Sequence, residues 1–167
     1  TVLFMSSKNS HLVKSTDFVG CLKSPIVISG DEMADKTFDY RFTYHSGKHI
    51  FRDCTWEKMN KCPCVLASNT SDLEFINTNF NDCTNDGNDV KAAVYVDGDE
   101  PCKFVCYNCR FTKCKVGFYG GIHFTQENSN VQINYTVFEG CGPDPQTNDG
   151  DLEGTSLYVD TKDVGLY

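Results

Sequence analysis

The segment Phe104–Cys114 reads Phe-Val-Cys-Tyr-Asn-Cys-Arg-Phe-Thr-Lys-Cys, and it holds the pattern that decides the fold. Phe104 and Cys106 are apolar and two positions apart, the spacing of the inward residues in a strand with one buried face. They are followed by a Phe-x-x-Cys unit, which occurs five times with Cys-to-Cys steps of 33, 29, 31 and 27 residues. The five copies are Phe18…Cys21, Phe51…Cys54, Phe80…Cys83, Phe111…Cys114 and Phe138…Cys141. An internal period near 30 residues predicts a repeat architecture.

The residues around each Phe-x-x-Cys unit keep a common register. Two positions before the Phe stand Thr16, His49, Thr78, Cys109 and Thr136. Seven and five positions before the Phe, three copies carry apolar pairs, namely Leu73/Phe75, Phe104/Cys106 and Val131/Ile133. The first copy offers His11/Val13, and the second fits with Phe42/Tyr44 if two extra residues lie in the segment 45–48. These pairs predict a second short strand in each unit.

A further column of apolar pairs with period two lies upstream of these strands. Its members are Val2/Phe4, Ile26/Ile28, Cys64/Leu66, Val94/Val96, Ile122/Phe124 and Leu157/Val159. No window shows an apolar stripe with the 3.6-residue period of a capped helix, so we expect little helix. Each unit is therefore expected to contain three short strands joined by polar bends.

Three short strands per repeat describe a coil that buries its inward side chains only by stacking on its neighbours. We expect an all-β, right-handed parallel β-helix of about five to six coils, roughly 25–30 Å long at 4.8 Å per coil. A leucine-rich repeat would need an L-x-x-L-x-L framework, which no unit supplies, and a β-sandwich would not explain the fivefold register. Residues 1–167 form one domain in this interpretation. Neither end carries a capping segment, so we expect a piece of a longer solenoid whose partners are flanking coils or other copies.

Cysteines and glycosylation sequons indicate the setting of the protein. The chain has 10 cysteines, and Asn69 and Asn134 each begin an Asn-x-Ser/Thr sequon. Together they favour an oxidising, extracellular or cell-surface location. The alternative is a reduced protein whose buried thiols behave as small hydrophobic groups. A zinc site at Cys62/Cys64 and Cys106/Cys109 is a lesser alternative, because the first pair has only one spacer residue.

The cysteines of the repeat are predicted to form a ladder at one corner of the coils. Its members are Cys21, Cys54, Cys83, Cys114 and Cys141. Neighbouring members would fall within the Cα separation that a disulfide tolerates. Spacing alone leaves open whether they pair or remain a stacked column of thiols.

Charge and hydropathy exclude two classes of partner. The formal net charge is −8, with 15 Lys+Arg against 23 Asp+Glu. A protein that binds nucleic acid through the phosphate backbone would present a basic face, so we expect no nucleic-acid partner. No stretch has the roughly 18–20 apolar residues that a membrane-spanning helix needs.

The repeat motifs resemble those of a known family. Gly120-Gly121-Ile122-His123, Phe138-x-x-Cys141 and the Asn-Cys-x-Phe of Asn108–Phe111 resemble pectin-lyase-like β-helix repeats. They are nearest to the polymorphic outer-membrane-protein type, whose repeats carry Gly-Gly-Ala-Ile and Phe-x-x-Asn elements. This chain departs from that pattern because Cys replaces Asn in every Phe-x-x-Asn position and only one copy keeps the double glycine. The resemblance implies a surface protein with a β-helix fold.

Acidic residues recur in the bend after the first strand of each unit. The candidates for an acidic ledge are Asp97, Asp99, Glu100, Glu127 and Asp160. Aligned carboxylates could bind Ca²⁺ or attract a cationic partner. The alternative, which we favour, is a solvated charged edge that keeps the solenoid soluble, with no cofactor.

An enzyme that cleaves polysaccharides is the alternative that the family resemblance suggests. Asp97/Asp99 and Asp149/Asp151 are candidate acid–base pairs, and Lys103 and His123 are candidate bases. The chain lacks the Asn-Thr-Asp, Asp-Asp, Gly-His-Gly and Arg-Ile-Lys elements seen in polygalacturonases. We therefore expect no catalytic or metal residues. The expected role is a non-enzymatic structural or adhesive β-helix segment of an extracellular glycoprotein or filament, with polysaccharide binding or cleavage as the alternative and glycans as further partners.

Overall fold

The computed structural model describes residues 3–6, 10–20, 26–29, 47–59, 63–68, 72–85, 92–99, 101–116, 119–143, 156–161 and 163–166. Within these ranges the regular secondary structure consists of β-strands, with no helix. No helix that could cross a membrane is found in the part of the chain described. The expectation of an all-β protein is confirmed for these residues.

The strands form three parallel sheets that the chain visits in a fixed order. Sheet A contains β1 (Leu3–Ser6), β4 (Ile26–Ser29), β7 (Val65–Ser68), β11 (Val94–Asp97), β15 (Ile122–Phe124) and β18 (Leu157–Val159). Sheet B contains β2 (His11–Lys14), β5 (Lys48–Arg52), β8 (Asp72–Ile76), β12 (Lys103–Tyr107), β16 (Asn130–Asn134) and β19 (Asp163–Leu166). Sheet C contains β3 (Asp17–Val19), β6 (Thr55–Glu57), β9 (Asn79–Asn81), β13 (Arg110–Thr112) and β17 (Val137–Glu139).

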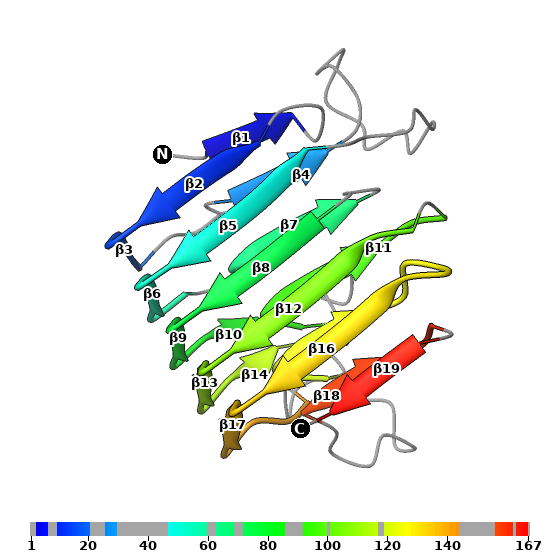
Figure 1. The fold of residues 1–167 in the computed structure, drawn as a ribbon. Helices are drawn as coiled ribbons and strands as arrows, with labels where there is room; N and C mark the ends of the chain where they lie inside the picture. The colour runs from blue at the N-terminus through cyan, green and yellow to red at the C-terminus, as the bar shows by residue number, and fades with distance from the viewer. Residues whose placement is uncertain are drawn as a thin grey trace.

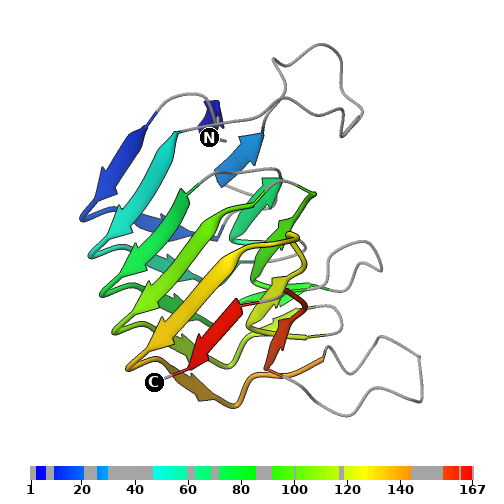
Figure 2. The ribbon, with the colours of Figure 1, turned by 45° about the vertical axis from the view of Figure 1, so that its right-hand side comes forward.

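Strands of one sheet lie side by side in chain order from the N-terminal to the C-terminal end, as Figures 1 and 2 show. A small fourth sheet pairs β10 (Thr84–Asn85) with β14 (Lys115–Val116). Every pairing is parallel, so equivalent residues of successive strands stack along the axis of the molecule. This arrangement is consistent with a β-solenoid.

An aromatic column fills the interior behind sheet C. Neighbouring ring centroids are 4.9, 4.9, 4.4 and 4.9 Å apart, and the rings are stacked in the order Phe18, Trp56, Phe80, Phe111 and Phe138. Sheet B adds a second stacked pair, Phe51 and Phe75, with centroids 5.2 Å apart. Offset ring stacking adds to the burial of apolar area, so these columns are a main source of stability.

The left-handed backbone conformation recurs at the turn between sheets B and C. Ser15, Asp53, Asn77, Asn108 and Tyr135 all have φ between 51° and 55°. Asn and Asp adopt this conformation more readily than other side-chain-bearing residues. The turn lets the chain bend sharply while its N–H groups bond the next strand layer, as Asn77 N does with Tyr107 O at 3.0 Å.

The strand pairing corrects the predicted register of the second repeat. Trp56, not Phe51, pairs with Phe18 and Phe80 in sheet C. Cys54 therefore does not belong to the predicted cysteine ladder. It stands two residues before Trp56, as Thr78 does before Phe80, and the ladder position three residues after Trp56 is taken by Met59. The sequence prediction failed because a large aromatic residue other than Phe can occupy the column.

A one-residue slip is corrected in sheet A. Ile26 pairs with Leu3 and with Val65, so the positions in register with Ile26/Ile28 are Leu3/Met5 and Val65/Ala67 instead of Val2/Phe4 and Cys64/Leu66. The other four predicted pairs of this column, and the three apolar pairs of sheet B together with His11/Val13, lie in the predicted register. His49/Phe51 holds the place predicted for Phe42/Tyr44, which lie outside the described residues.

Candidate functional site

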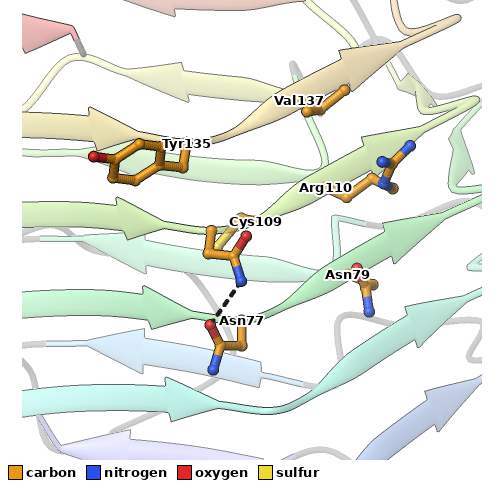
Figure 3. A pocket seen from close by; sticks show the side chains of 7 residues that line it. Asn77, Asn79, Cys109, Arg110, Tyr135 and Val137 are labelled. Atoms are coloured by element: carbon orange, nitrogen blue, oxygen red, sulfur yellow. Dashed lines mark hydrogen bonds between the residues drawn. The ribbon is translucent and has the colours of Figure 1, made fainter.

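An open hollow of about 280 Å³ lies on the outer surface where sheet B turns into sheet C (Figure 3). Its lining comes from three neighbouring repeats. The residues are Asn77, Asn79, Asn108, Cys109, Arg110, Tyr135 and Val137. Because they sit at equivalent turns of parallel layers, the repeat itself brings them together.

A row of hydrogen-bonded side chains, called the amide row below, consists of the amides of Asn108 and Asn77, which line the hollow, and the carboxylate of Asp53 beside it. Asn108 Nδ2 donates to Asn77 Oδ1 at 3.0 Å, and Asn77 Nδ2 donates to Asp53 Oδ1 at 3.1 Å. All three residues have the left-handed backbone conformation, which points their side chains along the stack. Sequence analysis missed this row. The signal was present as Asp or Asn immediately before the small residue of each turn, in Asp53-Cys54, Asn77-Thr78 and Asn108-Cys109.

The rim of the hollow adds a cation and exposed apolar groups. Arg110 donates to Glu139 Oε2 at 3.1 Å in an exposed ion pair. Tyr135 is 70% exposed and packs edge-to-face on Tyr107, with ring centroids 5.5 Å apart. Amide, guanidinium and tyrosine groups around a concave surface can hydrogen-bond and stack on a polar ligand.

The acidic residues gather only partly. Asp97 ends β11 and Asp160 follows β18, but Thr125 occupies the layer between them. Asp99 and Glu127 lie in adjacent layers, because Glu127 N donates to the carbonyl of Gly98 at 2.9 Å. Glu100 lies outside the described residues. Among the residues that the structure describes, no group of three or more His, Cys, Asp or Glu side chains could hold a metal ion.

The structure places the two candidate bases on different sheets. Lys103, on β12 of sheet B, is 4.0 Å from Glu74 Oε1, which Lys48 Nζ approaches more closely at 2.8 Å. His123, on β15 of sheet A, is buried and stacks between Tyr95 and Tyr158 at centroid distances of 5.1 and 5.0 Å. Tyr119 packs on the same histidine at 4.8 Å. Asp149 and Asp151 lie outside the described residues.

A second histidine lies in the interior of sheet B. His49 is fully buried, and its Nδ1 is 3.2 Å from Nδ1 of His11, with the two rings stacked. Burial, and then repulsion from His11, lower the pKa of His49 to about 4. The imidazole of His49 is therefore neutral near pH 7.

Three cysteines of the predicted ladder are placed by the structure at one corner, and Cys64 joins them. Cys83, Cys114 and Cys141 follow β9, β13 and β17, and neighbouring thiols are in contact. Cys64 Sγ donates to Cys83 Sγ at 3.2 Å. The eight cysteines within the described ranges are free thiols, while Cys21 and Cys62 lie outside these ranges.

The pKa values of Cys83, Cys114 and Cys141 at this corner are raised, so these three thiols are held protonated. A hydrogen bond from Cys114 lowers the pKa of Cys83, whereas contact with Cys64 and burial raise it. The two raising effects together are larger, so the pKa of Cys83 is raised. Contact with Cys114 and then burial raise the pKa of Cys141.

In the Cys106-x-x-Cys109 pair, burial raises the pKa of Cys106, and the bond from Cys106 lowers that of Cys109. Cys54 and Cys109 also donate to backbone carbonyls, as Thr78 does in its own turn.

The sequon at Asn134 ends β16, and Asn134 is partly buried there. Its carbonyl accepts a bond from Thr136 Oγ1 at 3.2 Å. Asn69 lies outside the described residues. Gly120 and Gly121, which carry part of the family resemblance, lie where Gly142 and Ser156 approach so closely that a side chain would overlap their backbone atoms.

No protein-family model matches the chain, and no curated protein or solved structure shows significant similarity to it.

Proposed function

We propose that the chain is a non-enzymatic structural or adhesive segment of a right-handed parallel β-helix, in an extracellular or cell-surface glycoprotein. Strands of sheets A, B and C recur in the same order along the chain, which is what successive coils of such a helix require. The right-handed sense follows the strong preference of parallel crossover connections. The partners are flanking coils or further copies, which would pair with the outermost strands.

The continuous aromatic column carries this proposal. Five rings stacked at 4.4–4.9 Å bind successive layers into a rigid rod. A rigid rod suits a spacer or filament unit. The candidate bases Lys103 and His123 lie on different sheets, which argues against a shared acid–base centre.

The enzymatic alternative is tested by incubating the secreted, purified chain with acidic and neutral polysaccharides, with and without Ca²⁺. We expect no new reducing ends and no unsaturated products under either condition. Cleavage that disappears in an Asp97→Asn variant, but persists in an Asp17→Asn variant on β3, would overturn the structural role. Asp17 is a suitable control because it is exposed and lies on the N-terminal edge strand of sheet C, whereas Asp97 lies on sheet A.

Glycan binding is a second candidate, because the hollow beside Asn77 offers amides, Arg110 and the exposed ring of Tyr135. Screening on a glycan array tests it with the Tyr135→Asn variant. Asn is the residue at the equivalent turns, Asn77 and Asn108, and it keeps the sequon at Asn134 intact. Binding that falls at least about tenfold in this variant, but not in Leu12→Asn on β2, would support the hollow as the glycan site.

A further inference from the structure

We propose that Cys64 and Cys83 form a disulfide bond that closes one turn of the chain. Cys64 immediately precedes β7, and Cys83 follows β9, so the bond would enclose one strand from each of sheets A, B and C. It would join the start of this three-strand repeat to its end, on the side of the molecule where the chain passes from sheet C to sheet A. This crosslink differs from the predicted ladder, whose members would join successive turns.

The geometry brings the two sulfur atoms within reach of each other. Their separation is 3.2 Å, and both residues are fully buried. A disulfide needs an S–S distance near 2.05 Å, so the sulfurs must approach by only about 1 Å. Cys64 is anchored by its N–H, which donates to Ala93 O at 2.8 Å, and Thr84 N donates to Met59 O at 2.8 Å beside Cys83.

The neighbouring thiols divide naturally into pairs. Cys83 also contacts Cys114, but Cys114 has a second partner in Cys141. Pairing Cys83 with Cys64 leaves Cys114 and Cys141 together. Pairing Cys83 with Cys114 would strand Cys64 and Cys141. Cys54 instead donates to the backbone carbonyls of Val13 and Arg52, as a threonine would at that position.

The reaction requires an external oxidant, for which a small disulfide such as oxidised glutathione suffices. A Cys83 thiolate attacks one sulfur of glutathione disulfide and releases one glutathione thiolate. The Cys64 thiolate then attacks the protein sulfur of the mixed disulfide and releases the second. The two protein thiols lose two electrons and two protons, which reduce one glutathione disulfide to two glutathione molecules. Because both thiols are buried in the folded chain, this exchange takes place while the chain folds.

Peptide mapping tests the bond directly. The chain is refolded with reduced and oxidised glutathione, its free thiols are alkylated in denaturant, and it is digested with trypsin and a Glu-specific protease. Cleavage after Lys61, Glu74 and Lys91 gives fragments 62–74 and 75–91. We expect these fragments to remain joined until a reductant is added. Alkylated Cys83, or Cys83 joined to the fragment that carries Cys114, would overturn the proposal.

Variants identify which cysteine of the first fragment takes part. Cys62→Ser should keep the two fragments joined, and Cys64→Ser should separate them. Fragments that separate in Cys62→Ser would equally overturn the proposal. Since the buffer supplies the oxidant, the result is independent of the extracellular role proposed above.

Thermal unfolding provides a second readout, namely the difference in unfolding midpoint between the oxidised protein and the protein treated with reductant. Cysteines 64 and 83 are 19 positions apart, and closing a loop of this size should raise the unfolding midpoint by roughly 5–10 °C. Cys64→Ser should lower the midpoint of the oxidised protein by that amount. Cys54→Thr is the matched control, because threonine already occupies the equivalent turn positions Thr16 and Thr78, and it should leave the reductant-sensitive shift unchanged.

Discussion

The position of Gly120 requires glycine, because neighbouring backbone atoms leave no room for a side chain. Its φ is +68°, and a Cβ at this position would overlap backbone atoms of Gly142 and Cys114. Left-handed strain and steric overlap add, so we expect Gly120→Ala to lower the free energy of unfolding by roughly 3 kcal/mol. Urea denaturation of the purified variant measures this loss.

Gly140 is the matched control for that substitution. It also has a positive φ, of +63°, but its nearest neighbour would be Lys113 Cγ at 3.9 Å, which is ordinary contact. Lys58, Asp82 and Lys113 adopt the same conformation with full side chains at equivalent turns. Gly140→Ala should therefore cost only about 1 kcal/mol. Equal losses in the two variants would contradict the close approach at Gly120.

His49 makes the stability of the fold sensitive to acid. Its pKa is lowered to about 4 by burial and by His11, whereas an unfolded histidine titrates near 6.5. The unfolded chain therefore binds more protons between these pH values, and the free energy of unfolding falls as the pH drops from about 6.5 towards 4. The full loss is about 3 kcal/mol, at 1.4 kcal/mol per pH unit.

Urea denaturation between pH 7.5 and 5 checks this pH dependence, above the range in which most carboxylates titrate. His49→Leu is the informative variant, because Leu73 occupies the next position of the same column. It should flatten the pH dependence over this range. An unchanged slope in His49→Leu would mean that another group is responsible.

At the scale of elements, the amide row joins three turns through side chains. Asn77 is its centre, with one bond to Asp53 and one from Asn108. Asn77→Ala removes both bonds and puts a less suitable residue in the left-handed region, so we expect a loss of roughly 2–3 kcal/mol. Asn77→Gly removes the same bonds but relieves the backbone, and it should cost less. If Ala and Gly prove equally costly in thermal or urea unfolding, the backbone conformation makes no contribution.

The strands themselves were largely predictable, because apolar pairs with period two mark the inward positions wherever one face of a strand is apolar and the other is polar. The register failed at two places for identifiable reasons. Trp56 was overlooked because Phe51-x-x-Cys54, five residues earlier, matches the repeat motif. In sheet A, Cys64/Leu66 was predicted in place of Val65/Ala67 because Cys64 and Leu66 are equally apolar. The hollow was not predictable, since its residues come from three separate repeats and meet only through the stacking of equivalent turns.

At the scale of the whole molecule, stability should vary along the stack. Each inner strand, such as β8 or β12, bonds a neighbour on both sides, whereas β2 and β19 each have one neighbour within the described sheet. In a stack whose stability is a sum of nearest-neighbour terms, the outermost layers open first. We expect amide hydrogens of β8 and β12 to exchange at least about tenfold more slowly than those of β2 and β19 in dilute solution.

Hydrogen exchange followed by mass spectrometry at two protein concentrations separates the effects of fraying and assembly. Uniform protection of all layers in dilute solution would contradict the nearest-neighbour description and would mean that the stack opens as one cooperative unit. If copies stack end to end, raising the concentration should slow exchange in β2, β3, β17 and β19 selectively, because their open edges then pair with another chain. Protection at the edges that does not depend on concentration would count against end-to-end stacking of copies, and the structural role would then depend on flanking coils alone.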